Sequence, residues 1–285
     1  MGCPDWPKCF GKWVPPTQVT ELPENYQEVF AVAGKSIAPF DAFKTWTEYI
    51  NRLIGVVIGF LILLTVVFAF PYRKTDPKIF WLSFLALLLV GFQGWIGAKV
   101  VATDLATWMI TIHMVIALVI VGLLIYTITR SQQFKIQQKQ THKHLHKLLL
   151  LGLCIGLIQT ISGTQVREWV DQIALMIDDR NQWIDHASAV FYFHRSLSSL
   201  NLVISFYLFT QYRKLFYPHQ LIYKSGLALL LLMSLQAFTG VILSNLGFPG
   251  QMQSIHLTLG SLTIGLQLFI AILVFTKTEI ESHSA

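Results

Sequence analysis

The stretch Gln93-Gly-Trp-Ile-Gly97, followed by His113, recurs later in the chain as Gln236-Ala-Phe-Thr-Gly240, followed by His256. In both copies the Gln, the Gly and the His are separated by 4 and then 16 positions. The matched residues lie 143 positions apart, so the two halves of the chain are expected to repeat one helical unit.

The repeat extends upstream, where Asn51-Arg52 recurs as His194-Arg195. Asn51 precedes His113 by 62 positions, and His194 precedes His256 by the same 62. Equivalent helices are separated by an even number of predicted spans. The halves are therefore expected to be parallel repeats, related by an axis along the membrane normal.

The composition indicates a membrane protein. Of the 285 residues, 54% are hydrophobic and 13% are charged, whereas a soluble domain has about 25% charged residues. This excludes an ordinary soluble enzyme and a disordered chain. With 18 Gly and 3 Cys, collagen-like and disulfide-framework proteins are also excluded. The net charge of +6 lies mainly in short loops between apolar runs, which argues against a nucleic-acid partner.

An all-α polytopic membrane protein is therefore predicted, because a spanning helix needs about 20 apolar residues. Seven segments qualify: 49–70, 78–98, 105–129, 147–166, 188–211, 222–245 and 254–276. The first, third and fifth loops between spans are basic and are expected in the cytoplasm, whereas the 167–187 loop is largely acidic. A plasma-membrane protein with an outer N-terminus and a cytoplasmic C-terminus follows.

These boundaries predict five regions. They are an extracytoplasmic segment 1–47, a first half-bundle 48–129, a basic cytoplasmic linker 130–146, a second half-bundle 147–276 and a cytoplasmic tail 277–285. The second half has four predicted helices and the first has three. We expect a further helix to precede residue 1 in the intact protein, through truncation or a start codon assigned too far downstream. A true seven-helix protein is the alternative.

Three histidines lie inside predicted spans, where ionisable residues are costly and usually functional. His194 and His256 belong to the same half and are expected to face each other across a four-helix bundle, as in a six-coordinate haem site. Zinc is disfavoured because no third ligand lies at their depth. Two polar helix-packing histidines are the alternative. The first half has His113, but it has Asn51 where the repeat predicts a second histidine. This difference suggests a site with one ligand, for a substrate.

Glu48 lies one helical turn before Asn51. It could serve as a general acid or base, or simply favour the helix N-terminus through the dipole. Arg52 and Arg195 follow the candidate ligand positions, where they could pair with haem propionates or reach the membrane interface. Gly97 and Gly240 are expected to allow close backbone approach.

Cys3 and Cys9 flank a short loop in the predicted outer segment. A disulfide suits an oxidising compartment, and thiol exchange near a redox cofactor is the alternative.

Several motifs together resemble the heme A synthase family, over nearly the whole chain. They are Gly2-Cys-Pro-Asp-Trp-Pro-Lys-Cys9, Glu48-Tyr-Ile-Asn-Arg-Leu-Ile-Gly55, the stretch from Gln93 and Gly97 to His113, Gly163-Thr-Gln-Val-Arg-Glu168, His194-Arg195 and His256. The resemblance implies an eight-helix fold of two four-helix bundles, of which this chain has seven predicted spans and lacks the first.

The resemblance also implies an activity, oxidation of the C8 methyl group of haem o to a formyl group through a hydroxymethyl intermediate. The haem a formed serves terminal oxidases. His194 and His256 would bind a haem b cofactor, His113 would bind the substrate haem, and Glu48 would be the catalytic carboxylate. Cys3 and Cys9 would be the outer-loop pair.

The implied partners are haem o, membrane lipids, an electron donor, and possible contacts with haem o synthase and terminal oxidase assembly. Asn51 departs from the family's Glu-x-x-His-Arg pattern, which places a second axial ligand on the substrate haem in doubt. The alternative functions are a non-enzymatic b-type membrane cytochrome and a haem-binding protein derived from the enzyme.

Overall fold

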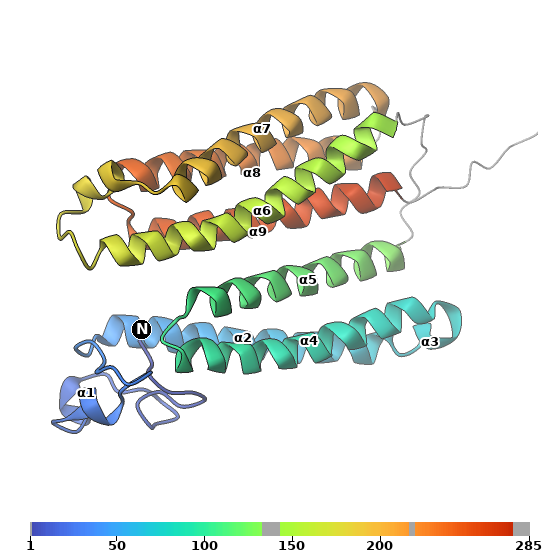
Figure 1. Ribbon diagram of the computed structural model, residues 1–285. Coiled ribbons are helices and arrows are strands. Elements are labelled where there is room, and N and C mark those ends of the chain that lie inside the picture. The colour runs from blue at the N-terminus through green and yellow to red at the C-terminus, as the bar shows by residue number, and fades with distance from the viewer. Residues whose placement is uncertain (1, 133–142, 217–219, 276–285) are drawn as a thin grey trace, which may run out of the picture. The chain divides into compact units, whose positions relative to one another are not determined.

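The computed structural model describes residues 2–132, 143–216 and 220–275, and Figure 1 shows these ranges as helices joined by loops. The all-α prediction is confirmed, since the only β-type pairings within those ranges are the bridges Cys9–Lys12 and Val32–Lys35. In chain order the helices are η1 (Val19–Glu21), α1 (Tyr26–Val29), α2 (Ala42–Ala69), α3 (Tyr72–Thr75), α4 (Pro77–Ala102), α5 (Thr107–Gln132), α6 (Lys143–Ile173), η2 (Arg180–His186), α7 (Ala189–Phe216), α8 (Gln220–Asn245) and α9 (Gly250–Phe275).

Six of these helices are long and apolar enough to cross a membrane, namely α2, α4, α5, α6, α8 and α9. The chain is therefore a multi-pass membrane protein. The predicted span 188–211 coincides with α7, which has 28 residues but is not among the six. Helix α7 contains Arg195, Arg213 and Lys214 together with several serines, and these lower its hydropathy. A count of seven spans is thus not confirmed by length and composition.

Helix α2 begins seven residues before the predicted first span, because Asp41 caps it. The backbone N–H of Lys44 donates to Asp41 Oδ1 at 3.1 Å, an N-terminal capping bond. The same hydrogen bond lowers the pKa of the Asp41 carboxyl. Helix α2 therefore begins within the segment 1–47 that the sequence analysis assigns to the outer side.

Contacts divide the chain into two units, Met1–Leu124 and Ile125–Ala285. The sequence analysis ends the first half-bundle at residue 129, within α5. Most of the predicted linker 130–146 (residues 133–142) and the predicted tail 277–285 lie outside the described residues.

The second unit is a closed four-helix bundle. Helix α6 packs against α7 and α9, and α8 packs against the same two helices, so α7 and α9 lie opposite each other. Two apolar clusters occupy the two ends of its interior. One includes Leu149, Ile222 and Ile270, and the other includes Trp183 and Phe248.

The bundle interior also contains buried polar side chains. They include Gln159, Ser162, Asn201, Ser205, Thr239, Thr263 and Gln267. Because lipid offers no hydrogen bonds, such side chains are stabilised when they bond across helices, as the Gln267 amide does to Asn201 Oδ1 at 3.2 Å.

In the first unit, α2 packs along α4, and α5 joins them through an apolar cluster of Ile62, Ala86 and Ile120. The amide of Gln93 on α4 also donates to the carbonyl of His113 on α5 at 2.6 Å. The end of α8 lies 143 positions after the end of α4, and the start of α9 lies 143 positions after the start of α5. These two helix boundaries follow the same offset as the sequence motifs.

Candidate functional site

The structure brings His194 of α7 and His256 of α9 together inside the second unit. Their ring centroids are 6.3 Å apart and the ring planes are inclined by 60°. Bonds between histidine nitrogen and a metal are about 2 Å long, so this separation leaves room for one metal ion between the two rings. The paired histidines predicted from the sequence therefore lie opposite each other across a helical bundle.

Two glycines let these rings approach the neighbouring helices. A Cβ at Gly240 of α8 would lie 3.4 Å from His256 Cε1, and a Cβ at Gly163 of α6 would lie 3.3 Å from His194 Cε1. The distance at Gly163 is shorter than ordinary van der Waals contact and that at Gly240 is at its lower limit, so a side chain longer than Cβ at either position would press on the ring. The predicted close approach at Gly240 is confirmed, and Gly163 makes an equivalent approach that the sequence interpretation did not single out.

The Nδ1 atoms of both rings bond to the neighbouring helices. His194 Nδ1 lies 3.0 Å from the carbonyl of Gln159 and 3.1 Å from Ser162 Oγ, while His256 Nδ1 lies 2.8 Å from Thr239 Oγ1. A carbonyl only accepts, so His194 must carry its proton on Nδ1 to bond to Gln159. Its Nε2 then keeps a free lone pair, which is the form that binds a metal.

The same tautomer follows for His256. The hydroxyl of Thr239 donates its single proton to the carbonyl of Gln236 at 2.8 Å. The oxygen of Thr239 can therefore only accept from His256 Nδ1–H, which leaves Nε2 unprotonated. Two facing imidazoles with two free Nε2 lone pairs fit the axial ligands of a six-coordinate haem.

The first unit differs. Gly97 again lies beside a histidine, since a Cβ there would be 3.6 Å from His113 Cε1, as predicted. Asn51 is exposed on α2 and His113 is half-buried on α5. Within the described residues, no hydrogen bond or ring contact joins the two side chains. The structure therefore does not bring these two predicted substrate residues together as it does the pair in the second unit.

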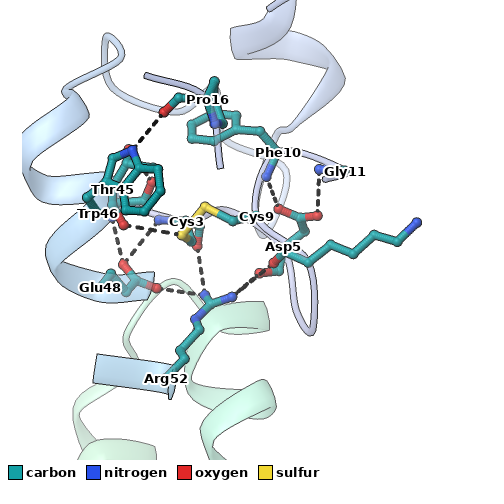
Figure 2. The surroundings of a disulfide bond; sticks show 12 residues. Cys3, Asp5, Cys9, Phe10, Gly11, Pro16, Thr45, Trp46, Glu48 and Arg52 are labelled. Carbon is teal, nitrogen blue, oxygen red and sulfur yellow. Dashed lines mark hydrogen bonds and ion pairs between the residues drawn. A yellow bond between two sulfur atoms is a disulfide. The ribbon is translucent and has the colours of Figure 1, made fainter. Parts of the chain in front are cut away.

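Glu48 and Arg52 contact the N-terminal segment instead (Figure 2). Glu48 Oε2 accepts from the backbone N–H groups of Gly2 at 2.7 Å and Cys3 at 3.1 Å. Its Oε1 accepts from Arg52 Nη2 at 2.7 Å. Because α2 begins at Ala42, Glu48 lies beyond the first helical turn, where the dipole acts. The helix-dipole explanation for Glu48 is therefore disfavoured.

The guanidinium of Arg52 holds the loop closed by the disulfide. It donates to the carbonyls of Asp5 at 2.7 Å, Lys8 at 3.0 Å and Cys3 at 3.3 Å. With 15% of its side chain exposed, Arg52 is largely enclosed by these contacts. Arg195, its counterpart in the repeat, is exposed on α7. The two arginines share a sequence position but have different surroundings.

Cys3 and Cys9 form a disulfide, as predicted, and both residues are fully buried. They pack in a small core with Phe10 and Tyr26, on which the rings of Phe30 and Phe40 close edge to face. Exchange with an external thiol requires access to a sulfur atom. The burial therefore favours the disulfide over the exchange role.

Sequence comparison identifies several similar curated proteins, each named heme A synthase. The protein from Shewanella oneidensis is 30% identical over 164 residues, which are 57% of this chain and 47% of that protein. The protein from Allorhizobium ampelinum is 26% identical over 166 residues, covering 54% of this chain and 45% of its own length. The aligned part of the chain thus spans about half the length of these relatives.

No solved structure matches the chain significantly. The sequence profile of the COX15-CtaA family, described as cytochrome oxidase assembly protein, matches residues 1–268. This match includes the histidine pair, the buried disulfide and the helices that position them, and on this basis the chain belongs to the COX15-CtaA family.

Proposed function

We propose that this protein is a heme A synthase, which oxidises the C8 methyl group of haem o to a formyl group through a hydroxymethyl intermediate. The observation that carries the proposal is the His194–His256 pair, whose Nδ1 atoms are both bonded and whose Nε2 atoms are both free for a metal. The name shared by the similar curated proteins supports the same activity.

The second unit is the proposed haem b site. His194 and His256 would be the axial ligands. The hydroxyl oxygens of Ser162 and Thr239 accept hydrogen bonds from their Nδ1–H groups. Arg195, exposed one position after His194, is placed to pair with a propionate. When bound, haem b supplies one-electron transfer. The glycines at 163 and 240 keep both rings against their supporting helices, so that the ligands are positioned before the haem binds.

The first unit is the proposed haem o site, with His113 as the axial ligand and Asn51 and Arg52 as further contacts. Glu48 is the proposed catalytic carboxylate, and its two oxygens are where a proton would be held. Both oxygens accept hydrogen bonds from Arg52 and from the start of the disulfide loop. This support fixes the orientation of the carboxylate on α2.

The proposed setting is a plasma membrane, with two parallel helical repeats. The N-terminal segment and the histidine layer lie toward the outer face, and the C-terminus lies in the cytoplasm. The basic loops of the sequence support this orientation, which requires α7 to cross the membrane in addition to the six candidate spans. Haem o synthase, terminal oxidase assembly and an electron donor in the membrane are the proposed partners.

The test uses a host that makes haem o but no haem a. The full chain is expressed there, and the extracted haems are separated by chromatography with mass detection. We expect haem a or the hydroxymethyl intermediate. Glu48→Ala is expected to abolish both products while the haem b content stays unchanged. Unmodified haem o alone, with haem b bound to the wild-type chain, would contradict the enzyme.

A b-type membrane cytochrome is the second candidate, and one observation favours it. The structure assembles the bis-histidine site but leaves Asn51 and His113 without a shared contact, and Glu48 is engaged by the loop. A cytochrome needs only the first site. In that case Glu48→Ala would leave all haem spectra and electron-transfer rates unchanged.

A further inference from the structure

One short motif supports each histidine of the pair. It reads Gln-x-x-Ser-Gly at Gln159–Gly163 of α6 and Gln-x-x-Thr-Gly at Gln236–Gly240 of α8. In each copy the glycine faces the Cε1 atom of the imidazole, and the hydroxyl one position earlier meets its Nδ1. The hydroxyl proton goes to the carbonyl of the motif's own glutamine. Each motif therefore presents an acceptor to the ring.

A third copy of the motif lies on α4 and lacks the hydroxyl. It reads Gln93-Gly-Trp-Ile-Gly97, so Ile96 stands where Thr239 stands in the repeat. Gly97 still faces His113 Cε1. Ile96 is 2% exposed, and within the described residues the buried Nδ1 of His113 has no hydrogen-bond partner. The ring is thus approached in the same way but is not held through Nδ1.

The geometry points to this one position as the determinant of how each histidine holds its haem, an inference that rests on the proposed function. Thr239 is a positioning residue that makes His256 a fixed ligand, and Ser162 does so for His194 together with the carbonyl of Gln159. Ile96 makes His113 an exchangeable ligand. An acceptor on Nδ1 fixes the tautomer and ring orientation and makes Nε2 a stronger donor. A resident cofactor needs such a ligand, whereas a substrate that enters and leaves as product needs a weaker one.

The first experiment removes the hydroxyl in the second unit. Thr239→Val keeps the volume of the side chain, and Thr239→Ser keeps the hydroxyl as a matched control. Loss of an outer-shell partner typically weakens metal binding about 10- to 100-fold. In the purified full chain we expect Thr239→Val to release haem b to apomyoglobin about 10-fold faster or more, and to shift its midpoint potential upward. Thr239→Ser is expected to match the wild type in both measurements.

The converse experiment adds the hydroxyl in the first unit. Ile96→Thr and Ile96→Val shorten the side chain equally, and only the first supplies an oxygen opposite His113 Nδ1. With haem o as the probe, we expect Ile96→Thr to slow its transfer to apomyoglobin about 10-fold relative to Ile96→Val. Haem b in the second unit should be released at the wild-type rate in both variants.

The outcomes separate the inference from the function. If wild-type protein binds haem b, and Thr239→Val matches it in release rate and potential, the inference is wrong and the proposed function stands. Equal haem o release from Ile96→Thr and Ile96→Val also overturns the inference. If the wild-type chain binds no haem, both fail together.

Discussion

The helices α5 and α9 occupy corresponding positions in the two halves but have very different surroundings. Half of the most apolar 18-residue stretch of α9 is buried inside the protein, whereas 6% of the corresponding stretch of α5 is buried. Helix α9 lies in a closed ring of four, whereas the long helices described in the first unit are only α2, α4 and α5. The comparison teaches that a shared motif fixes where a histidine stands on its helix, and that neighbouring helices decide what the histidine can hold.

The interiors of the two units also differ at the positions two and three helical turns after the histidines and after Asn51. The second unit places Asn201 and Ser205 after His194, and Thr263 and Gln267 after His256, all of them buried. The corresponding positions of the first unit are apolar, namely Ile58, Ile62, Ile120 and Leu124. The second unit thus contains buried polar side chains, including the bonded pair Gln267 and Asn201, at positions where the first unit is apolar.

The largest effect on this contrast is expected from Gly156→Leu. A Cβ at Gly156 of α6 would lie 3.0 Å from Gln267 Oε1, so a larger side chain must push α6 away from α9. Overpacking of this kind costs about 1–3 kcal/mol, and we expect the upper end of that range. Thermal unfolding in detergent measures it. Gly91→Leu on α4 is the matched control, because a Cβ there meets nothing within 4 Å. Since Leu is also the better helix former, this variant should not lower the unfolding temperature.

A smaller loss of stability is expected when the interior of the second unit is made more like that of the first unit. Gln267→Leu introduces the residue found at Leu124 and removes the donor to Asn201 Oδ1. A buried polar group left without its partner costs about 1–3 kcal/mol. The double variant with Asn201→Leu should recover part of that loss, since both partners are then apolar. If the double variant lost as much free energy of unfolding as the two single variants together, the two side chains would not be coupled.

Loss of the hydrogen bonds between Arg52 and the disulfide loop should have a local effect. Arg52→Gln removes the guanidinium that bonds to Asp5, Lys8 and Glu48. Because the partners are partly exposed backbone and carboxylate groups, we expect about 1 kcal/mol, seen as faster amide hydrogen exchange in residues 2–10. Arg195→Gln, at the corresponding position in the repeat, should leave exchange in that loop unchanged. Equal exchange in Arg52→Gln and wild type would show that Arg52 does not hold this loop in place.

The smallest expected effect is the pH response of the N-terminal segment. Hydrogen bonds from the Thr17 backbone and hydroxyl and from the Gln18 backbone lower the pKa of the exposed Glu21 to about 2 from an ordinary 4.5. The folded pKa is the lower one, so ionised Glu21 stabilises the segment above about pH 4.5. That stabilisation is lost as the pH falls toward 2. Protection against hydrogen exchange at Thr17 and Gln18, taken relative to the intrinsic rate at each pH, should fall over this window, and Glu21→Gln should remove this pH dependence of protection.

Much of the fold was predictable because it depends on local pattern. Long apolar runs gave the spanning helices, and the recurrence of Gln, Gly and His identified the pair at His194 and His256. The disulfide was predicted from the oxidising compartment expected for the N-terminal segment. The start of α2 was missed by seven residues, because Asp41 caps a polar turn that lies outside any apolar run.

The unpredicted features depend on contacts between distant residues. Arg52 reaches carbonyls more than 40 positions away, and nothing in its sequence neighbourhood distinguishes it from Arg195. Ser162 and Thr239 were also missed as supports of the pair. A signal for them was present, since Gln-x-x-Ser/Thr-Gly occurs at both 159–163 and 236–240. Its meaning requires knowing that each copy faces a histidine on another helix.

The most direct test of the central claim measures which histidines hold the resident haem. His113→Ala, His194→Ala and His256→Ala are each purified as the full chain in detergent, and low-temperature electron paramagnetic resonance and haem extraction are compared with the wild type. We predict a low-spin, bis-imidazole haem b signal that persists in His113→Ala and is lost in each of the other two. Retention of that signal in His256→Ala, or its loss in His113→Ala alone, would contradict the assignment of the cofactor to the second unit.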